Sequence, residues 1–415
     1  MPGNPRPNLR CLASLGALLA GCTLFAGITC AAEIRVTADL RINATDATPS
    51  FLRGGLGKLR SDAPFSANTS QIQFNATQHW GEAWRGELNV IASPDDVDGR
   101  PSLTEAFAEF RPYPHGGWRM RVKVGAFYAP ISLENRAVGW ESPYTASPSG
   151  INSWIGEEVR TVGAELQLDR LRVRIAEHDN EFGILLAAYG WNDFAGAYLA
   201  ARGFRVQDRQ TSLVGNVAAH GLKAYSLGPF HEADGRAGFY AGARWRLDQR
   251  LEVRAMRYDN RANPAIYLAA VDDFAWHTRF TAVGLRLEGR SGWTLISQWL
   301  QGDTEFAPDG TARRWVYDSA FVLLSQQINA RHIVSLRYDD FNLHGVTAGT
   351  PPPNLDEGNA WTLAWFFQPA ERWRIGAEVQ RVDSFASKRR LLLGVDPTAR
   401  ESRLELSLRR EFVFR

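Results

Sequence analysis

The amino-acid sequence predicts an all-β fold, a transmembrane antiparallel β-barrel of about 16 strands with long extracellular loops and short periplasmic turns. Three observations lead to this prediction. Apolar and charged residues alternate in steps of two along much of the chain beyond residue 33. Tryptophan opens four of the alternating segments directly after short polar turns. Eight longer irregular segments lie between the hairpins that these turns form.

The start of the chain has the character of an export signal. Arg6 and Arg10 precede an uncharged, mostly apolar stretch that ends in Cys-Ala-Ala, which is a small-x-small cleavage site. We expect cleavage after Ala32. This makes residues 1–32 a signal peptide and residues 33–415 the transmembrane barrel.

Two other interpretations of the leader stay open. Residues 19–22 resemble a lipobox whose cysteine, Cys22, is lipidated, and the apolar stretch is long enough to remain as an uncleaved membrane anchor. The chain stays apolar from Thr23 to Ile28, where a lipoprotein usually has a polar tether, and this favours cleavage. The chain is exported under each interpretation.

Composition excludes several classes of protein. Cys11, Cys22 and Cys30 all lie in the leader, so the remainder holds neither disulfides nor thiolate metal sites. The chain has 47 basic and 45 acidic residues, and Arg6 and Arg10 account for the difference. A balanced charge gives no indication of nucleic-acid binding.

The alternation has the period of a strand with one apolar face. In the segment 118–126, Val122 and Val124 share a face, and Arg121 and Lys123 share the other. The same pattern recurs in the segments 34–42, 239–247, 373–379 and 404–414. A soluble sandwich has a mixed polar face, whereas this one is dense with Arg and Glu, as expected for a wet lumen. Transmembrane strands need about 9–11 residues, and these segments are about that long.

The tryptophans that open strands predict an interfacial girdle. Trp84, Trp118, Trp293 and Trp373 each follow a short turn. Tryptophan at the same end of repeated hairpins is typical of a barrel, because its amphipathic ring favours the headgroup level.

The long segments set the strand count. Eight of them fit the extracellular ends of eight hairpins and therefore 16 strands, namely 44–68, 93–102, 130–157, 192–235, 260–278, 303–313, 343–358 and 384–401. The alternation changes parity at Asp169-Arg170. We interpret this as a β-bulge followed by a turn at 178–181; a turn at Asp169-Arg170 itself requires a different count.

One stretch resembles a known family. The run "GAFYAPISLEN" (125–135), preceded by "EAFAEFRPYPHGGWRMRVKV", is similar to the strand-then-loop signature of the phosphate-selective porin superfamily, which matches at Pro130, Ser132, Leu133 and Glu134. The resemblance implies a 16-stranded porin of the bacterial cell outer membrane and a homotrimer. The chain departs from the family where Tyr128 replaces the usual lysine, and it lacks the lysine cluster associated with anion capture.

The polar face supplies the candidate site. Our pore-lining and anion-binding candidates are Arg85, Arg119, Arg121, Lys123, Arg244, Arg246, Arg254, Arg374, Glu105 and Glu109. Two interpretations stay open: the charges pair along the wall and stiffen it, or bases on some strands face acids on others across a constriction. The loop 130–157 is our candidate for folding inward as that constriction.

The sequence therefore predicts a porin for the passive diffusion of small hydrophilic, anionic solutes, with outer-membrane lipid as its surroundings. Its eight histidines are scattered and no Gly-x-Ser-x-Gly or His-Glu-x-x-His motif occurs, so we expect no catalytic residue, metal or cofactor. Two alternatives remain: a non-conducting barrel that acts as an adhesin or scaffold through its loops, and a barrel enzyme.

Overall fold

A computed structural model describes residues 32–93, 101–137, 139–213, 217–218, 226–346 and 355–415. Within these residues the side chains of 68–70, 217–218, 226–227 and 309 are not described. The predicted signal peptide (1–32) lies outside the described part except for Ala32, the first residue of β1, and its two alternatives also fall on the residues outside it.

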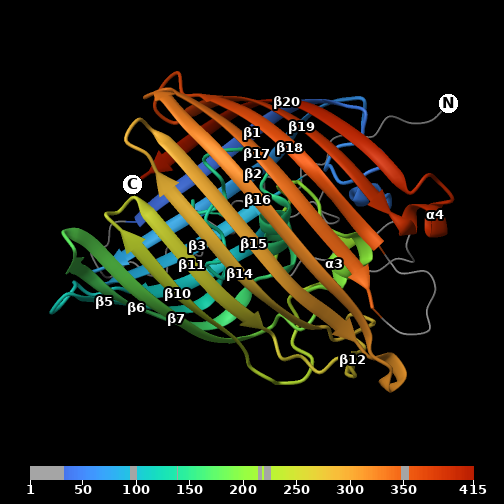
Figure 1. The fold of residues 1–415 in the computed structure, drawn as a ribbon, viewed down its shortest axis with the longest axis horizontal. Coiled ribbons are helices and arrows are strands. Elements are labelled where there is room, and N and C mark those ends of the chain that lie inside the picture. The colour runs from blue at the N-terminus through green and yellow to red at the C-terminus, as the bar shows by residue number, and fades with distance from the viewer. Residues whose placement is uncertain (1–31, 94–100, 138, 214–216, 219–225, 347–354) are drawn as a thin grey trace.

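The described residues form a closed antiparallel barrel of sixteen strands (Figure 1). In chain order the strands are β1 (Ala32–Thr45), β2 (Phe65–Trp80), β3 (Trp84–Ala92), β4 (Ser102–Phe110), β5 (Trp118–Phe127), β6 (Thr161–Ile175), β7 (His178–Gly190), β10 (Gly238–Leu247), β11 (Leu251–Asp259), β14 (His277–Glu288), β15 (Trp293–Phe306), β16 (Arg313–Asn329), β17 (His332–Gly345), β18 (Leu355–Phe367), β19 (Trp373–Ala386) and β20 (Thr398–Phe414). Each strand pairs with its neighbours in the chain, and β1 pairs with β20 to close the barrel. The predicted fold class and strand count are confirmed.

The two faces of the wall follow the alternation. On β20, Leu404 and Leu406 are exposed on the outer wall, whereas Arg403 and Glu405 point inward and are buried. This is the arrangement that a bilayer requires, because lipid solvates the apolar face and cannot satisfy charged groups.

The tryptophan edge also has the predicted position. Trp84, Trp118, Trp293 and Trp373 are the first residues of β3, β5, β15 and β19, and between 36% and 54% of each is exposed. All four lie at the end of the barrel where the start of β1 meets the end of β20.

The parity change is a bulge, as predicted. The register between β6 and β7 shifts between Arg170 and Val173, and Arg172 has a φ of 53°. The predicted turn at 178–181 is wrong by two residues. Ala176 and Glu177 form the turn with φ values of 47° and 70°, a pair of positive φ angles that suits the twist of a two-residue hairpin.

The other elements lie in the long segments. They are the helices α2 (Gly150–Glu158), α3 (Ala197–Arg202) and α4 (Ser387–Leu393), the 3₁₀ turns η2 (Phe51–Arg53) and η3 (Pro308–Gly310), and the small sheets β8 (Val217–Ala218) with β9 (Ser226–Leu227) and β12 (Tyr267–Leu268) with β13 (Asp273–Phe274). In Figure 1, α3 and α4 lie toward the end of the barrel opposite the C-terminus. No helix among the described residues is long and apolar enough to cross a bilayer.

Candidate functional site

The segment between β5 and β6 folds into the barrel. Its helix α2 is buried along its whole length, and Trp154 on that helix packs against the rings of Phe280 and Tyr317 on the inner wall, with centroids 5.3 and 5.2 Å away. We call residues 128–160 the inward loop. It crosses the interior and reaches the opposite wall.

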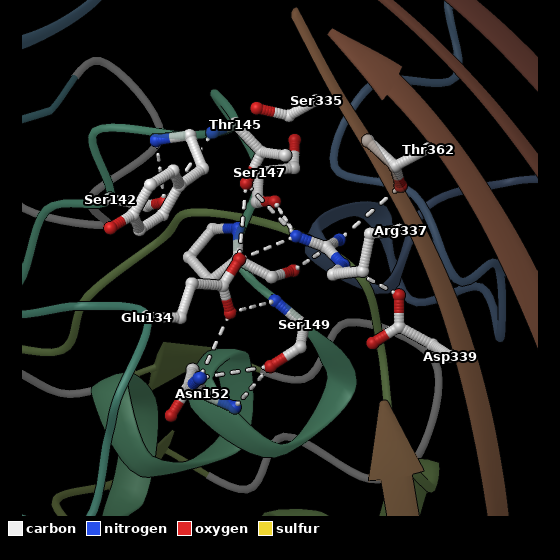
Figure 2. Close-up of polar contacts among 12 residues, drawn as sticks. Glu134, Ser142, Thr145, Ser147, Ser149, Asn152, Ser335, Arg337, Asp339 and Thr362 are labelled. Atoms are coloured by element: carbon white, nitrogen blue, oxygen red, sulfur yellow. Dashed lines mark hydrogen bonds and ion pairs between the residues drawn. The ribbon is translucent and has the colours of Figure 1, made fainter. Parts of the chain in front are cut away.

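A buried arginine of β17 holds this loop (Figure 2). Arg337 donates from Nη1 to Glu134 Oε1 at 2.7 Å and to the carbonyl of Ser147 at 2.6 Å, and from Nη2 to the carbonyl of Pro148 at 3.0 Å. Its Nε donates to Asp339 Oδ2 at 2.7 Å. The side chains of Arg337, Glu134 and Asp339 are fully buried, so a single guanidinium pairs with two carboxylates away from solvent.

The two carboxylates also bind the start of helix α2. Ser149 N donates to Glu134 Oε2 at 3.0 Å, and Gly150 N donates to Asp339 Oδ1 at 3.0 Å. Ser149 caps the helix through its hydroxyl, which accepts from the backbone N–H of Asn152. Negative charge at a helix N-terminus is stabilising, so the anchor also orients α2.

Further anchors follow on β19 and β20. Glu378 accepts from the backbone N–H groups of Ala146 and Ser147 at 2.6 and 3.3 Å. Arg403 donates to Glu378 at 3.0 Å and to the hydroxyl of Ser147 at 2.5 Å, and Arg409 pairs with Glu141. The loop is thus fixed to three of the last four strands, β17, β19 and β20.

A second segment also folds inward, which the sequence interpretation placed among the extracellular loops. Residues 192–212 are buried almost throughout, and Phe204 lies against Trp154 and Phe341. Glu158 joins the two segments, since its carboxylate accepts from Trp154 Nε1, Tyr198 N and Leu199 N at 2.6–2.9 Å. Burial raises the pKa of Glu158 to about 7.

Beneath the inward loop lies a cavity of about 320 Å³, which we call the arginine cavity. Its lining includes Arg121, Arg136, Arg244, Arg254, Glu105, Asp169, Tyr128, Pro130, Trp140, Leu185 and Met256. Four arginines thus face two carboxylates. A smaller cavity of about 40 Å³ lies on the other side of the loop, toward β1, β2, β19 and β20, and Asn135 and Trp140 line both cavities. We call it the minor cavity.

The predicted bases of β5 point inward and pair mainly with β6. Arg119 donates to Asp169 at 3.1 Å, and Arg121 bonds to Gln167 and lies 3.4 Å from Glu165. Lys123 lies 3.8 Å from Glu165 and over the rings of Phe107 and Phe127. Of the three, only Arg121 lines the arginine cavity.

The predicted acids are near neighbours of these bases and do not oppose them across the lumen. Glu109 on β4 lies 3.5 Å from Arg85 and 3.9 Å from Arg121. Glu105 accepts from the backbone N–H of Tyr128 at 3.3 Å and lines the arginine cavity. At β4 and β5 the arrangement therefore has the character of paired charges along the wall.

Of the four remaining candidates, three line one of the two cavities. Arg244 and Arg254 line the arginine cavity, where Arg244 lies 2.7 Å from Asp169. Arg246 pairs with Glu252 at 2.9 Å outside its lining. Arg374 lines the minor cavity, packs on the ring of Phe366, and makes no ion pair within the part of the chain that is described.

The sequence interpretation missed three important residues. Asp169 was assigned to the bulge, although it lies just before it and accepts from two arginines. Glu134 enters the sequence analysis only as a family match, and Arg337 is not among the pore-lining candidates. A glutamate in a loop expected to fold inward was the available signal, because a buried carboxylate requires a cationic partner.

One group of described residues has the spacing of a cation site. The carboxylates of Asp193, Glu232 and Asp234 lie within 4.8 Å of one another at the extracellular end of β7. Backbone N–H groups of Ala233, Trp191, Gly235, Arg236 and Asn263 donate to these carboxylates. This cluster lies apart from both cavities, and its bonds already account for its geometry.

Comparisons with known proteins agree with the fold. No protein-family model matches the sequence, and no curated protein matches it. Among solved structures the chain is similar to the outer membrane channel DcaP of Acinetobacter baumannii, with 11% identity, a TM-score of 0.53, and 92% of this chain and 97% of that one covered. It is also similar to OmpT, an outer membrane protein of Vibrio cholerae, with 8% identity, a TM-score of 0.50, and coverage of 94% and 99%. The fold is therefore that of bacterial outer-membrane β-barrels.

Proposed function

We propose that this outer-membrane barrel is a porin that passes small hydrophilic anions passively and belongs to the phosphate-selective porin superfamily. The observation that carries the proposal is the pair of arginine-lined cavities on the two sides of the inward loop. Charged side chains at a narrow point are the means by which wide pores select ions. The proposal contains no catalytic step, and it includes a homotrimer, as the family resemblance implies.

The charge balance at the cavities supports anions as the solute. The arginine cavity has two more arginines than carboxylates in its lining. The minor cavity is balanced, because its lining has three arginines and three carboxylates, so the excess of positive charge is confined to the arginine cavity. An excess of positive charge around a narrow space attracts anions, and its field extends about 10 Å at 0.1 M salt and about 3 Å at 1 M.

Planar-bilayer recording tests the proposal. The refolded protein should give stepwise conductance, and a KCl gradient of low ionic strength should give a zero-current potential that indicates anion preference. The double variant Arg244→Gln/Arg254→Gln should move that potential toward cation preference, and the effect should fade at 1 M salt. Arg257→Gln is the matched control, because Arg257 lies on the same strand as Arg254 and faces outward.

Two results contradict the proposal. One is a cation preference in the unchanged protein, and the other is an equal shift in the variant and the control. Gel electrophoresis of unboiled protein checks that each variant is folded and reports the trimer.

A second candidate function is a barrel that does not conduct and presents its loops to a partner. The packed interior favours it, since Leu199, Phe204 and Val206 of the second inward segment are buried against the wall and inward loop. Folded protein that inserts into bilayers without any conductance would support this function over the porin.

A further inference from the structure

The arginine cavity has a charged side and an apolar side, and the strand register explains why. One row of inward positions joins Asp169, Gly183, Arg244 and Arg254 across β6, β7, β10 and β11. The next row toward the extracellular end joins Gln167, Leu185, Gly242 and Met256. Each row contains a glycine that lines the cavity, and the space that a side chain would take there is occupied by Asp169 beside Gly183 and by Met256 beside Gly242.

The inward loop adds more apolar surface above these rows. Tyr128 and Trp140 stack with centroids 4.4 Å apart, and both rings line the cavity together with Pro130. Their polar atoms are directed elsewhere, because Tyr128 donates to Gln210 and Trp140 donates to the carbonyl of Asn152. They therefore offer ring surface to the cavity and no hydrogen-bonding group.

On the charged side the arginines outnumber the carboxylates with which they pair. Arg244 shares Asp169 with Arg119, and Arg254 shares Glu252 with Arg136 and Arg246. A guanidinium has five N–H donors and can bind a carboxylate through two of them at once. One planar anionic group therefore fits this side.

We infer that the arginine cavity is a binding site for monoanions with an apolar body, of which arylcarboxylates are the simplest class. Small-molecule sites have volumes of about 300–1,000 Å³, and this cavity of about 320 Å³ fits a solute at the lower limit. Inorganic phosphate occupies only the arginine side and leaves Leu185 and Met256 against water. Covering about 60 Å² of apolar surface corresponds to about tenfold in affinity.

This inference rests on the porin proposal for its biological meaning, and its test separates the two. Benzoate, acetate and phosphate are titrated into the folded protein in detergent by calorimetry and into the bilayer chamber during chloride conduction. Benzoate should bind and block about ten times more strongly than acetate or phosphate. Chloride conduction without a preference for benzoate overturns the inference and leaves the porin proposal intact. Calorimetric binding of benzoate without conduction overturns the porin proposal and leaves the binding site intact.

Variants locate the site. Leu185→Ser should lower benzoate affinity to that of acetate and leave acetate binding unchanged, and Arg244→Gln should weaken both. Leu323→Ser is the matched control, because Leu323 is buried on the inner wall of β16 outside the lining of the cavity. If Leu185→Ser does not fold, Met256→Gln removes apolar lining from the same row. Benzoate affinity that is unchanged in these variants, or equally reduced in Leu323→Ser, overturns the assignment.

Discussion

Replacing Arg337 by methionine should destabilise the barrel more than any outward arginine can. The substitution removes the cation that two fully buried carboxylates share, Glu134 and Asp339. It also leaves the carbonyls of Ser147 and Pro148 without their donor. Removing one partner of a buried ion pair costs about 3–5 kcal/mol, because the remaining charge stays in a medium that solvates it poorly. We expect a loss of that order and a loosened inward loop.

Urea unfolding in lipid vesicles, followed by tryptophan fluorescence, measures the loss, and current noise in bilayers reports the loop. Arg381→Met is the control, because Arg381 is exposed on the outer face of β19 and lies 3.5 Å from Asp383, where a pair contributes about 0–1 kcal/mol. Adding Glu134→Gln to Arg337→Met should recover part of the loss, since it removes one uncompensated charge. A loss below about 1 kcal/mol with unchanged noise refutes the view that Arg337 anchors the loop.

Three further outcomes follow from particular contacts. Burial raises the pKa of Glu158 from 4.5 to about 7, so the protonated side chain contributes stability below pH 4.5 and this contribution is lost as the pH rises to about 7. Glu158→Gln should remove that part of the pH dependence of the urea midpoint, measured between pH 4 and 8. Gly125→Ala should lower the free energy of unfolding by about 2–4 kcal/mol in the same assay, since Gly125 has a φ of 131° and the Cβ of the introduced alanine falls 2.3 Å from the carbonyl oxygen of Ala106. The control Gly81→Ala, at a φ of 63° in open space, should cost about 1 kcal/mol. In vesicles, Leu406→Arg on the outer wall should lower the free energy of unfolding by about 2–4 kcal/mol, and Thr398→Arg near the extracellular end should lower it by about 0–1 kcal/mol. Equal losses would contradict the view that Leu406 faces lipid and Thr398 lies near the membrane surface.

The strands could be predicted from the sequence because a barrel wall repeats with period two and one face must satisfy lipid. The alternation alone predicts that Leu404 and Leu406 face outward, and this prediction does not require knowing which residues lie beside them. The pairing of the site could not be predicted in this way. Arg119 meets Asp169 because of the register between β5 and β6, and a list of inward residues does not contain that register.

The anchors were still less accessible to sequence reasoning. Glu134 and Arg337 are 203 positions apart in the chain, and they meet only because the inward loop crosses the lumen. The second inward segment has no alternation at all. Its apolar residues Leu199, Phe204 and Val206 indicated burial, but not whether they are buried beneath an extracellular cap or inside the barrel.

The position of the anchors on β17, β19 and β20 has a consequence for biogenesis. The inward loop is synthesised more than a hundred residues before the strands that hold it, so during most of synthesis Glu134 has no guanidinium to meet. Docking of the loop and closure of β1 on β20 therefore both depend on the last strands to be synthesised, and they become one cooperative event of high contact order. An assembly intermediate that lacks the last four strands is an open sheet with an undocked loop, and completing the wall also fixes the interior around that loop.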